Sequence, residues 1–426
     1  MRTITQFRSF ERPVQLLLLN QLTINIGFYM LIPYLAAYLS GDLGLAIWIV
    51  GLVLGVRNFS QQGMFLIGGT LADRLGYKPL IVAGCALRTA GFALLGLVDS
   101  VPALIVASAA TGFAGALFNP AVRAYLAHDA GERRVEAFAL FNVFYQAGIL
   151  LGPLIGLALT GIDFRLTCVV AAGVFAMLTV LQVRSLPQRG GAEADGTTAQ
   201  ASVLADWRSV LANRSFLLFS TAMIGTYVLM FQVYLALPLE VRRLAGPGLA
   251  GTTGVAVLFA VSGVLTIAGQ LHVTAWCTRR WAPGQCLVAG LTLMGAAFLP
   301  PLLTAASPGS SGHPAVLLAP LVVSAAVLAL GTIIVFPFEM NTIVTLSGGR
   351  LVATYYGLYN TICGIGILAG NLLTGAALDL GRSAGLPALP WLGMVAVGLL
   401  CATAVAALSR AERLHPTEER TEPART

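Results

Sequence analysis

Charge is scarce in this 426-residue chain. Only 10% of the residues are Asp, Glu, Lys or Arg, and there is a single lysine, Lys78. A soluble domain of ordinary composition carries about a quarter charged residues. Hydrophobic residues make up 57% of the chain, so we expect much of its surface to face lipid rather than water.

The chemistry of common enzyme sites is also missing. The six cysteines and four histidines show no metal-ligand spacing, and no phosphate-binding loop of the form Gly-x-x-x-x-Gly-Lys-Ser/Thr is present. The segment "GRSAG" fits Gly-x-Ser-x-Gly but lies between two apolar runs, without the strand that a nucleophile elbow needs. We therefore predict no enzymatic activity, no cofactor and no bound metal.

Long runs without charge predict helices that cross a membrane. A spanning helix needs about 20 apolar residues, and the runs lack the alternation of barrel strands. Charges, prolines and Gly/Ser breaks divide the chain into twelve predicted spans. They lie at 14–39, 45–69, 80–98, 101–122, 136–160, 165–184, 215–239, 250–274, 285–305, 315–338, 351–378 and 388–409. The expected fold is an all-α membrane protein with twelve transmembrane helices.

The positions of the basic residues predict the orientation. With the N-terminus inside, 19 of the 25 Lys and Arg residues fall on the cytoplasmic side. This bias predicts a multi-pass protein of the cytoplasmic (inner) membrane, with both termini in the cytoplasm. It also accounts for the net charge of +7 without a nucleic-acid partner.

A hydrophilic stretch divides the chain into two halves of six spans. The expected domains are an N-terminal bundle at 1–185, a flexible cytoplasmic linker at 186–213, a C-terminal bundle at 214–409 and a cytoplasmic tail at 410–426. "FNVFYQAGILLGPLIGLAL" in the fifth span aligns with "YNTICGIGILAGNLLTGAAL" in the eleventh. The match predicts two pseudo-symmetric bundles that repeat in parallel orientation.

The stretch "GGTLADRLGYKP" at 68–79 concentrates charge in a predicted cytoplasmic turn. It resembles the loop between spans two and three of the major facilitator superfamily, whose twelve-helix transporter fold fits the two halves. The matching residues include Gly69, Asp73, Arg74, Gly76 and Lys78. The resemblance implies that Asp73 closes the cytoplasmic side by facing the start of span eleven, near 350–354. The alternative is a solvated turn that only obeys the charge bias.

"GILLGPLIG" in span five resembles the Gly-x-x-x-Gly-Pro motif of the drug:proton antiporter branch of that superfamily. Gly148, Gly152 and Gly156 would form one close-packing face, and Pro153 would remove a backbone hydrogen bond. Other stretches are similar to multidrug exporters of the same branch. The resemblance implies export, whereas the alternative is ordinary helix packing. The acid that several members carry in the first span is absent.

Four charged residues are candidates for proton or charge sites. Arg57 and Arg88 lie within spans, where an arginine costs about 2.5–3.5 kcal/mol on insertion, so each should face a cavity or a partner. The alternative is a structural arginine paired with helix carbonyls and an acid. Glu339 could be a titratable proton site or an interfacial acid. Asp163 is more readily explained as a loop ion pair with Arg165.

Polar and aromatic residues within the spans are candidates for a substrate cavity, because aromatic rings with polar tips suit amphipathic, often cationic, compounds. Each of them could instead serve helix packing. The candidates are Asn25, Tyr29, Asn58, Gln61, Gln146, Tyr227, Gln232, Tyr234, Tyr356 and Asn360.

Together these features predict a monomeric secondary transporter that exports small amphipathic compounds such as drugs by alternating access and proton antiport. Its expected partners are the small-molecule substrate, protons and membrane lipid. Two alternatives remain open: a transporter of an endogenous metabolite with the same fold, and a membrane receptor or scaffold without transport.

Overall fold

The computed structural model describes residues 2–31, 34–35, 38–160, 162–190, 202–245, 249–305 and 314–414, and every regular element within these residues is helical. The first half contains α1 (Arg2–Arg8), α2 (Arg12–Tyr29), η1 (Tyr38–Asp42), α4 (Ile47–Gln62), α5 (Phe65–Leu75), α6 (Tyr77–Leu97), α7 (Val101–Ala130), η2 (Gly131–Arg133), α8 (Arg134–Thr160) and α9 (Phe164–Ser185). The second half contains α11 (Arg214–Ala222), α12 (Ile224–Met230), η3 (Phe231–Val233), α13 (Ala236–Ala245), α14 (Leu249–Arg280), α15 (Pro283–Ala296), α16 (Leu299–Ala305), α17 (Pro314–Ser347), α18 (Val352–Ser383) and α19 (Leu389–Arg410). Between the halves lies α10 (Val203–Ala212).

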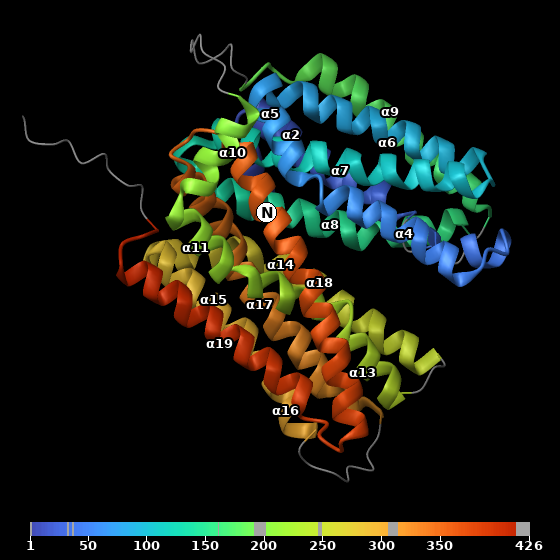
Figure 1. Cartoon of the computed structure of the whole chain (residues 1–426), viewed down its shortest axis with the longest axis vertical. Helices are drawn as coiled ribbons and strands as arrows, with labels where there is room; N and C mark the ends of the chain where they lie inside the picture. The colour runs from blue at the N-terminus through green and yellow to red at the C-terminus, as the bar shows by residue number, and fades with distance from the viewer. Residues whose placement is uncertain are drawn as a thin grey trace, which may run out of the picture.

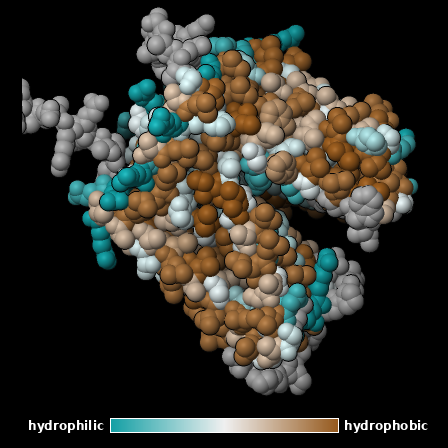
Figure 2. Space-filling view, viewed as in Figure 1, coloured by the Kyte–Doolittle hydropathy of each residue, from teal (hydrophilic) through white to brown (hydrophobic). Residues whose placement is uncertain are grey.

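The helices form two bundles, one from each half of the chain (Figure 1). The bundles meet near α5 and α10, which we call the latch end, and diverge toward α4 and α13, which we call the open end. Figure 2 shows the surface hollowed between the bundles on the open side. Nine helical segments of the described residues are long and apolar enough to cross a membrane. The outer surface is largely apolar (Figure 2), as expected for a protein that lipid surrounds.

Helices occupy all twelve predicted spans in the described part of the chain, but four of them are built from pieces, including the first, where α2 ends at Tyr29 and η1 begins at Tyr38. The second span is α4 and α5, interrupted at Gly63 and Met64; the seventh is α11, α12, η3 and α13; the ninth is α15 and α16. Pro300 and Pro301 follow the break in the ninth span, where they lack the N–H groups needed to continue α15. In the seventh span, Pro238 follows the break before α13 in a similar way, whereas no proline lies at the break between α11 and α12.

The predicted turn at 68–79 is mostly helical, which corrects the expectation from sequence. The helix α5 continues through Asp73 and Arg74 to Leu75, and α6 begins at Tyr77. Only Gly76 turns the chain, with a φ of 91° that residues with a side chain rarely adopt. The charged residues therefore sit on a rigid helix end rather than in a loop.

Glycine contacts support the predicted pseudo-symmetry of the two bundles. In the first bundle, a Cβ added to Gly148 or Gly152 of α8 would meet Asn25 or Tyr29 of α2. In the second bundle, the aligned glycines Gly366 and Gly370 of α18 would meet Ile224 or Val228 of α12 in the same way. In both bundles the two contacted residues are one helical turn apart, so the fifth span packs on the first in both halves.

The sequence predicted a flexible linker at 186–213, but part of this segment is helical in the structure. Residues 203–212 form α10, whose first turn is capped by Ser202, where the hydroxyl oxygen accepts a hydrogen bond from Ala205 N at 3.2 Å. Helix-forming residues in "VLADWRSVLA" and this cap explain the helix. The rest of the predicted linker at 191–201 and the tail at 415–426 lie outside the described residues.

Candidate functional site

The carboxylate of Asp73 joins the two bundles at the latch end. It accepts hydrogen bonds from the backbone N of Ala353 at 3.1 Å, from the backbone N of Thr354 at 2.6 Å and from Thr354 Oγ1 at 2.7 Å. Both backbone donors belong to the first turn of α18. A negative charge at a helix N-terminus is stabilised by the unpaired N–H groups and by the helix dipole. We call Asp73, Ala353 and Thr354 the latch.

A close approach of backbones makes the latch possible. A Cβ added to Gly69, one turn before Asp73, would collide with the carbonyl of Ala353. A Cβ on Gly357 of α18 would likewise collide with the carbonyl of Phe65. Small residues at these two positions therefore let α5 and α18 approach closely enough for the short Asp73 side chain to reach the helix end.

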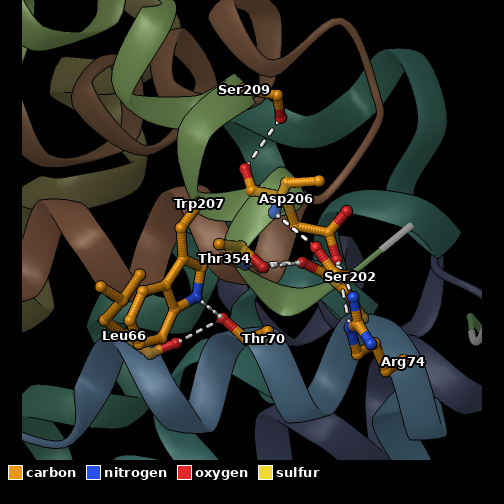
Figure 3. A network of polar contacts seen from close by, with 10 residues as sticks. Leu66, Thr70, Arg74, Ser202, Asp206, Trp207, Ser209 and Thr354 are labelled. Carbon is orange, nitrogen blue, oxygen red and sulfur yellow. Dashed lines mark hydrogen bonds and ion pairs between the residues drawn. The ribbon is translucent and has the colours of Figure 1, made fainter. Parts of the chain in front are cut away.

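The helix α10 lies against the same end of α5 (Figure 3). Arg74 donates to Asp206 Oδ2 from Nε at 3.1 Å and from Nη2 at 2.6 Å, with both side chains largely buried. The indole nitrogen of Trp207 donates to Thr70 Oγ1 at 2.8 Å, and Thr70 donates in turn to Leu66 O. The chain segment that connects the two bundles is thus tied to α5 by an ion pair and a hydrogen bond.

The turn between α5 and α6 contacts the segment that follows α9. The backbone N of Tyr77 donates to Arg189 O at 2.9 Å, and Arg189 pairs with Asp129 of α7 at 3.1 Å. Lys78 follows in the first turn of α6 and is half-buried. The motif at 68–79 therefore lies between the segment after α9 on one side and α18 with α10 on the other.

Polar contacts between the bundles continue from the latch toward the middle of the molecule. Arg123 of α7 donates to Asn360 Oδ1 of α18 at 2.9 Å. Asn142 of α8 donates to Gln270 Oε1 of α14 at 2.7 Å. Both bonds join helices of opposite halves, so a separation of the bundles at the latch end that reaches these helices must break them.

Glu339 of α17 is a buried acid close to this interface. Its side chain is 1% exposed, and its Oε1 accepts a hydrogen bond from the hydroxyl of Tyr359. Arg123 is close enough to act on it electrostatically. The burial argues against an interfacial acid, which was the alternative interpretation of Glu339. The carboxyl is instead enclosed by protein, next to the contact between the bundles.

A small polar cavity of about 40 Å³ lies inside the first bundle. The structure brings together three of the predicted cavity residues there, Asn25, Tyr29 and Gln61, with Arg88 beside them. The cavity is lined by Ile24, Asn25, Phe28, Tyr29, Gln61, Arg88, Asn119 and Tyr145.

Both arginines within the spans of the first bundle stack on one aromatic ring. The Cζ atoms of Arg57 and Arg88 lie 4.7 and 4.9 Å from the centre of the Phe28 ring, and Arg88 also lies 5.4 Å from that of Phe175. Arg57 donates to Asn58 Oδ1 at 3.1 Å and to Gln61 Oε1 at 3.4 Å. Among the described residues neither arginine pairs with an acid, which was part of the alternative interpretation of these residues as structural charges.

The remaining predicted cavity residues are placed elsewhere. Tyr356 and Gln232 are buried and donate to backbone carbonyls of their own bundle, those of Met340 and Val228. Tyr227 packs edge-on against Tyr359. The other three differ in exposure: Asn58 is exposed, Tyr234 is 48% exposed beside Phe259, and Gln146 is half-buried on α8.

Asp163 does not form the predicted side-chain pair with Arg165. Its Oδ1 accepts a hydrogen bond from the backbone N of Arg165 at 2.8 Å and so caps α9. The Arg165 guanidinium instead contacts both carboxylate oxygens of Asp99, at 2.7 and 2.8 Å. Because Asp99 is distant in sequence, the pair could not be read from local spacing.

The motif "GILLGPLIG" lies on the face of α8 that packs against α2. A Cβ on Gly156 would collide with the carbonyl of Met30, in line with the contacts of Gly148 and Gly152. Pro153 lies inside α8, and its carbonyl accepts a hydrogen bond from Tyr34 at 2.7 Å. The close-packing face is present, which is compatible with either interpretation of the motif.

Sequence reasoning missed Asp206, Trp207 and Arg123 as candidates. The first two lie in a segment read as linker, and Arg123 was counted only as a cytoplasmic charge. One signal was available for α10: an aromatic residue beside an acid in a short helix-forming segment that follows a Ser cap.

The comparisons with known proteins agree with this architecture. A family model described as Major Facilitator Superfamily matches residues 17–371. An uncharacterized MFS-type transporter of Mycobacterium tuberculosis is 54% identical over 404 residues, which cover 95% of this chain and 94% of that protein. The multidrug resistance protein MdtH of Shigella dysenteriae is 28% identical over 399 residues, 94% of each chain.

A solved structure shares the fold at low sequence identity. The crystal structure of the peptide transporter POT in complex with sulfate superimposes with a TM-score of 0.64, covers 97% of this chain and 99% of that one, and is 17% identical. At this identity the likeness concerns the arrangement of the helices alone.

Proposed function

The chain belongs to the Major Facilitator Superfamily, and on this premise we propose that it exports small amphipathic compounds by alternating access in exchange for protons. Relatives of 28% identity that carry the name multidrug resistance protein support drug-like substrates. The resemblance of the motif at 148–156 to that of the antiporter branch supports proton antiport. We further propose a monomer in the inner membrane, with both termini and the latch end in the cytoplasm.

The observation that carries the proposal is the latch. One carboxylate accepts three hydrogen bonds from the opposite bundle at the end where the bundles meet, while they diverge at the other end. In the proposed orientation this is an outward-facing state with a closed cytoplasmic gate. A hydrogen bond to a charged group contributes about 1.5–3 kcal/mol, which closes the gate yet allows it to open in each cycle.

Glu339 supports the proton part of the proposal. It is a buried carboxyl beside Arg123, whose bond to Asn360 joins the bundles. A change in the proton occupancy of Glu339 would therefore change the electrostatic field at a contact that must break on opening. One proton that crosses about 100 mV supplies about 2.3 kcal/mol, enough for a roughly 50-fold gradient.

Efflux from cells tests the proposal. Cells that produce the protein are loaded with a panel of fluorescent dyes and antibiotics, and efflux is measured with and without a protonophore. We expect lower accumulation than in cells without the protein, and we expect the protonophore to abolish the difference. The Asp73→Asn variant should lose at least about 90% of the efflux rate, because an amide cannot accept from all three donors.

Asp379→Asn is the matched control, because Asp379 is an exposed carboxylate near the far end of α18. It should retain efflux. Equal accumulation with and without the protein would contradict export, and a fully active Asp73→Asn variant would contradict the gating role.

A further inference from the structure

The cavity in the first bundle is lined by Arg88, and the guanidinium of Arg57 stacks beside it on Phe28; no acid in that bundle neutralises either charge. All eight acidic residues of residues 1–185 lie in the end turns of helices or in the connections between them. They are Glu11, Asp42, Asp73, Asp99, Asp129, Glu132, Glu136 and Asp163. The residues that line the cavity contribute amides, hydroxyls, rings and Arg88.

The arginine donors are not fully used within the described residues. Arg88 is 5% exposed, and its Nε is buried without a hydrogen-bond acceptor. The Nε of Arg57 is also buried without an acceptor. Stacking on Phe28 accommodates the faces of the two guanidinium groups, but it leaves the Nε–H donor in the plane of each group without an acceptor. Because Arg88 lines the cavity and has no acid partner, a ligand with acceptor oxygens in the cavity would meet its guanidinium and stabilise its charge.

The size and chemistry of the cavity indicate the kind of group that fits. A cavity needs about 10–15 Å³ to hold one water, so about 40 Å³ holds a group of three or four heavy atoms rather than a whole drug. Guanidinium groups match the planar oxygens of carboxylates and the oxygens of phosphates. Near the cavity, Tyr145 stacks on Phe141, which stacks on Phe336 of the other bundle. An apolar remainder would thus extend toward the interface between the bundles.

We infer that Arg88 and Arg57 bind the carboxylate or phosphate group of an amphipathic solute, so that the transported compounds are acids or zwitterions rather than simple cations. This inference rests on the proposed function, because it names the substrate class of the same transporter. It replaces the expectation of cationic ligands, which depended on aromatic residues alone.

A pair of dyes that differ in one carboxylate tests the inference. Rhodamine B carries a free carboxylate, and its ethyl ester has the same cationic ring system without it. Binding of both to the purified full-length protein in detergent is measured by fluorescence polarisation at constant ionic strength. We expect rhodamine B to bind at least about tenfold more tightly than the ester.

Substitutions of the two arginines test whether they cause the tighter binding of rhodamine B. Arg88→Gln and Arg57→Gln should each lose most of the preference while ester binding persists, which also shows that the variants are folded. Arg88→Lys, which keeps the charge, should retain part of it. Arg184→Gln is the matched control, because it removes an exposed positive charge from α9 and should change nothing.

An inorganic anion and two lipid compositions complete the test. Phosphate at constant ionic strength should raise the thermal unfolding temperature of the wild type but not of Arg88→Gln. The dye titration is repeated in nanodiscs of phosphatidylcholine alone and with phosphatidylglycerol. Competition by phosphatidylglycerol would identify a lipid headgroup as the source of the anion, and its absence would identify a free solute.

The inference is overturned if wild type binds both dyes equally, if Arg88→Gln keeps the preference, or if neither dye nor phosphate binds. These outcomes are separate from failure of the proposed function. Efflux that the protonophore does not change would refute proton antiport, but it would not contradict the binding of acidic solutes by the arginines. Intact efflux of the ester without a preference for the acid would refute only this inference.

Discussion

At the scale of single residues, the polar side chains of this membrane protein act in small groups. Asp73 can join the two bundles because the backbone N–H groups of Ala353 and Thr354, at the start of α18, donate hydrogen bonds to its carboxylate. Glu339 is enclosed because Tyr359 donates to it and Arg123 is near. Since an unsatisfied polar group in lipid costs several kcal/mol, each buried polar side chain in such a protein calls for a partner or a function.

Glu339 should be required for coupling but not for folding. Replacing it by Gln keeps an oxygen that can accept the Tyr359 hydrogen bond but removes the titrating group. We expect Glu339→Gln to lose proton-driven efflux, while exchange of substrate down its own gradient persists in proteoliposomes. Substrate flux with and without an imposed pH gradient measures this.

The matched control for that variant is Glu240→Gln, which changes an acid paired with Arg243 in α13. It should respond to the pH gradient like the wild type. A Glu339→Gln variant that still concentrates substrate in response to the gradient would exclude Glu339 as the proton site.

At the scale of elements, the α10 helix is the part of the linker that contacts the gate. Asp206 and Trp207 hold α10 against α5, next to the latch (Figure 3). The chain that connects the bundles thus restrains the same helix end that Asp73 uses. We expect α10 to favour the closed state of the latch end.

Loss of the α10 contacts should therefore open the latch end. Asp206→Asn combined with Trp207→Phe removes one ion pair and one hydrogen bond, which together stabilise closure by about 1–2 kcal/mol. We expect about a tenfold shift of the equilibrium toward the open latch end, measured as faster labelling of a cysteine that replaces the buried Ser347. Arg208→Gln, an exposed change on the same helix, should leave the labelling rate unchanged; equal rates in all three proteins would contradict a role for α10.

At the scale of the whole molecule, two bundles of similar internal packing share one interface. Their equivalent helix pairs, α2 with α8 and α12 with α18, meet through aligned glycines. Such internally close-packed bundles move as units more readily than they deform. The polar contacts between them are concentrated at the latch end and in the middle, so rotation about the middle would open one end and close the other.

This motion predicts opposite changes of distance at the two ends. Spin labels at Ser100 and Ala384 report the open end, and labels at Leu75 and Gly348 report the latch end. During turnover we expect a second population in which the first distance is shorter and the second longer. Labels at Ser100 and Asp163, which lie within one bundle, should keep a single distance. If the distances at the open end and at the latch end both stay unchanged during turnover, the result would contradict alternating access.

Much of the fold was predictable from sequence because its signals are local. Hydropathy located all twelve spans, and the repeated glycine pattern predicted two similar bundles. The breaks within the seventh span and the helical α10 were missed, since neither changes the mean hydropathy of its surroundings. In the candidate site, Asp73 was predicted to face α18, and Asn25, Tyr29 and Gln61 do share a cavity, whereas Tyr356 and Gln232 are packed within their own bundle.

The amino-acid sequence by itself determined that this chain lies in a membrane as two sets of six helices, because the transfer of apolar and charged residues into lipid is nearly additive along the chain. Only the tertiary structure decided which polar residues meet. Arg74 with Asp206, Arg123 with Asn360, and two arginines on Phe28 are contacts between distant helices. They depend on how each helix is rotated and how closely its small residues allow a neighbour to approach, and no local pattern encodes either quantity.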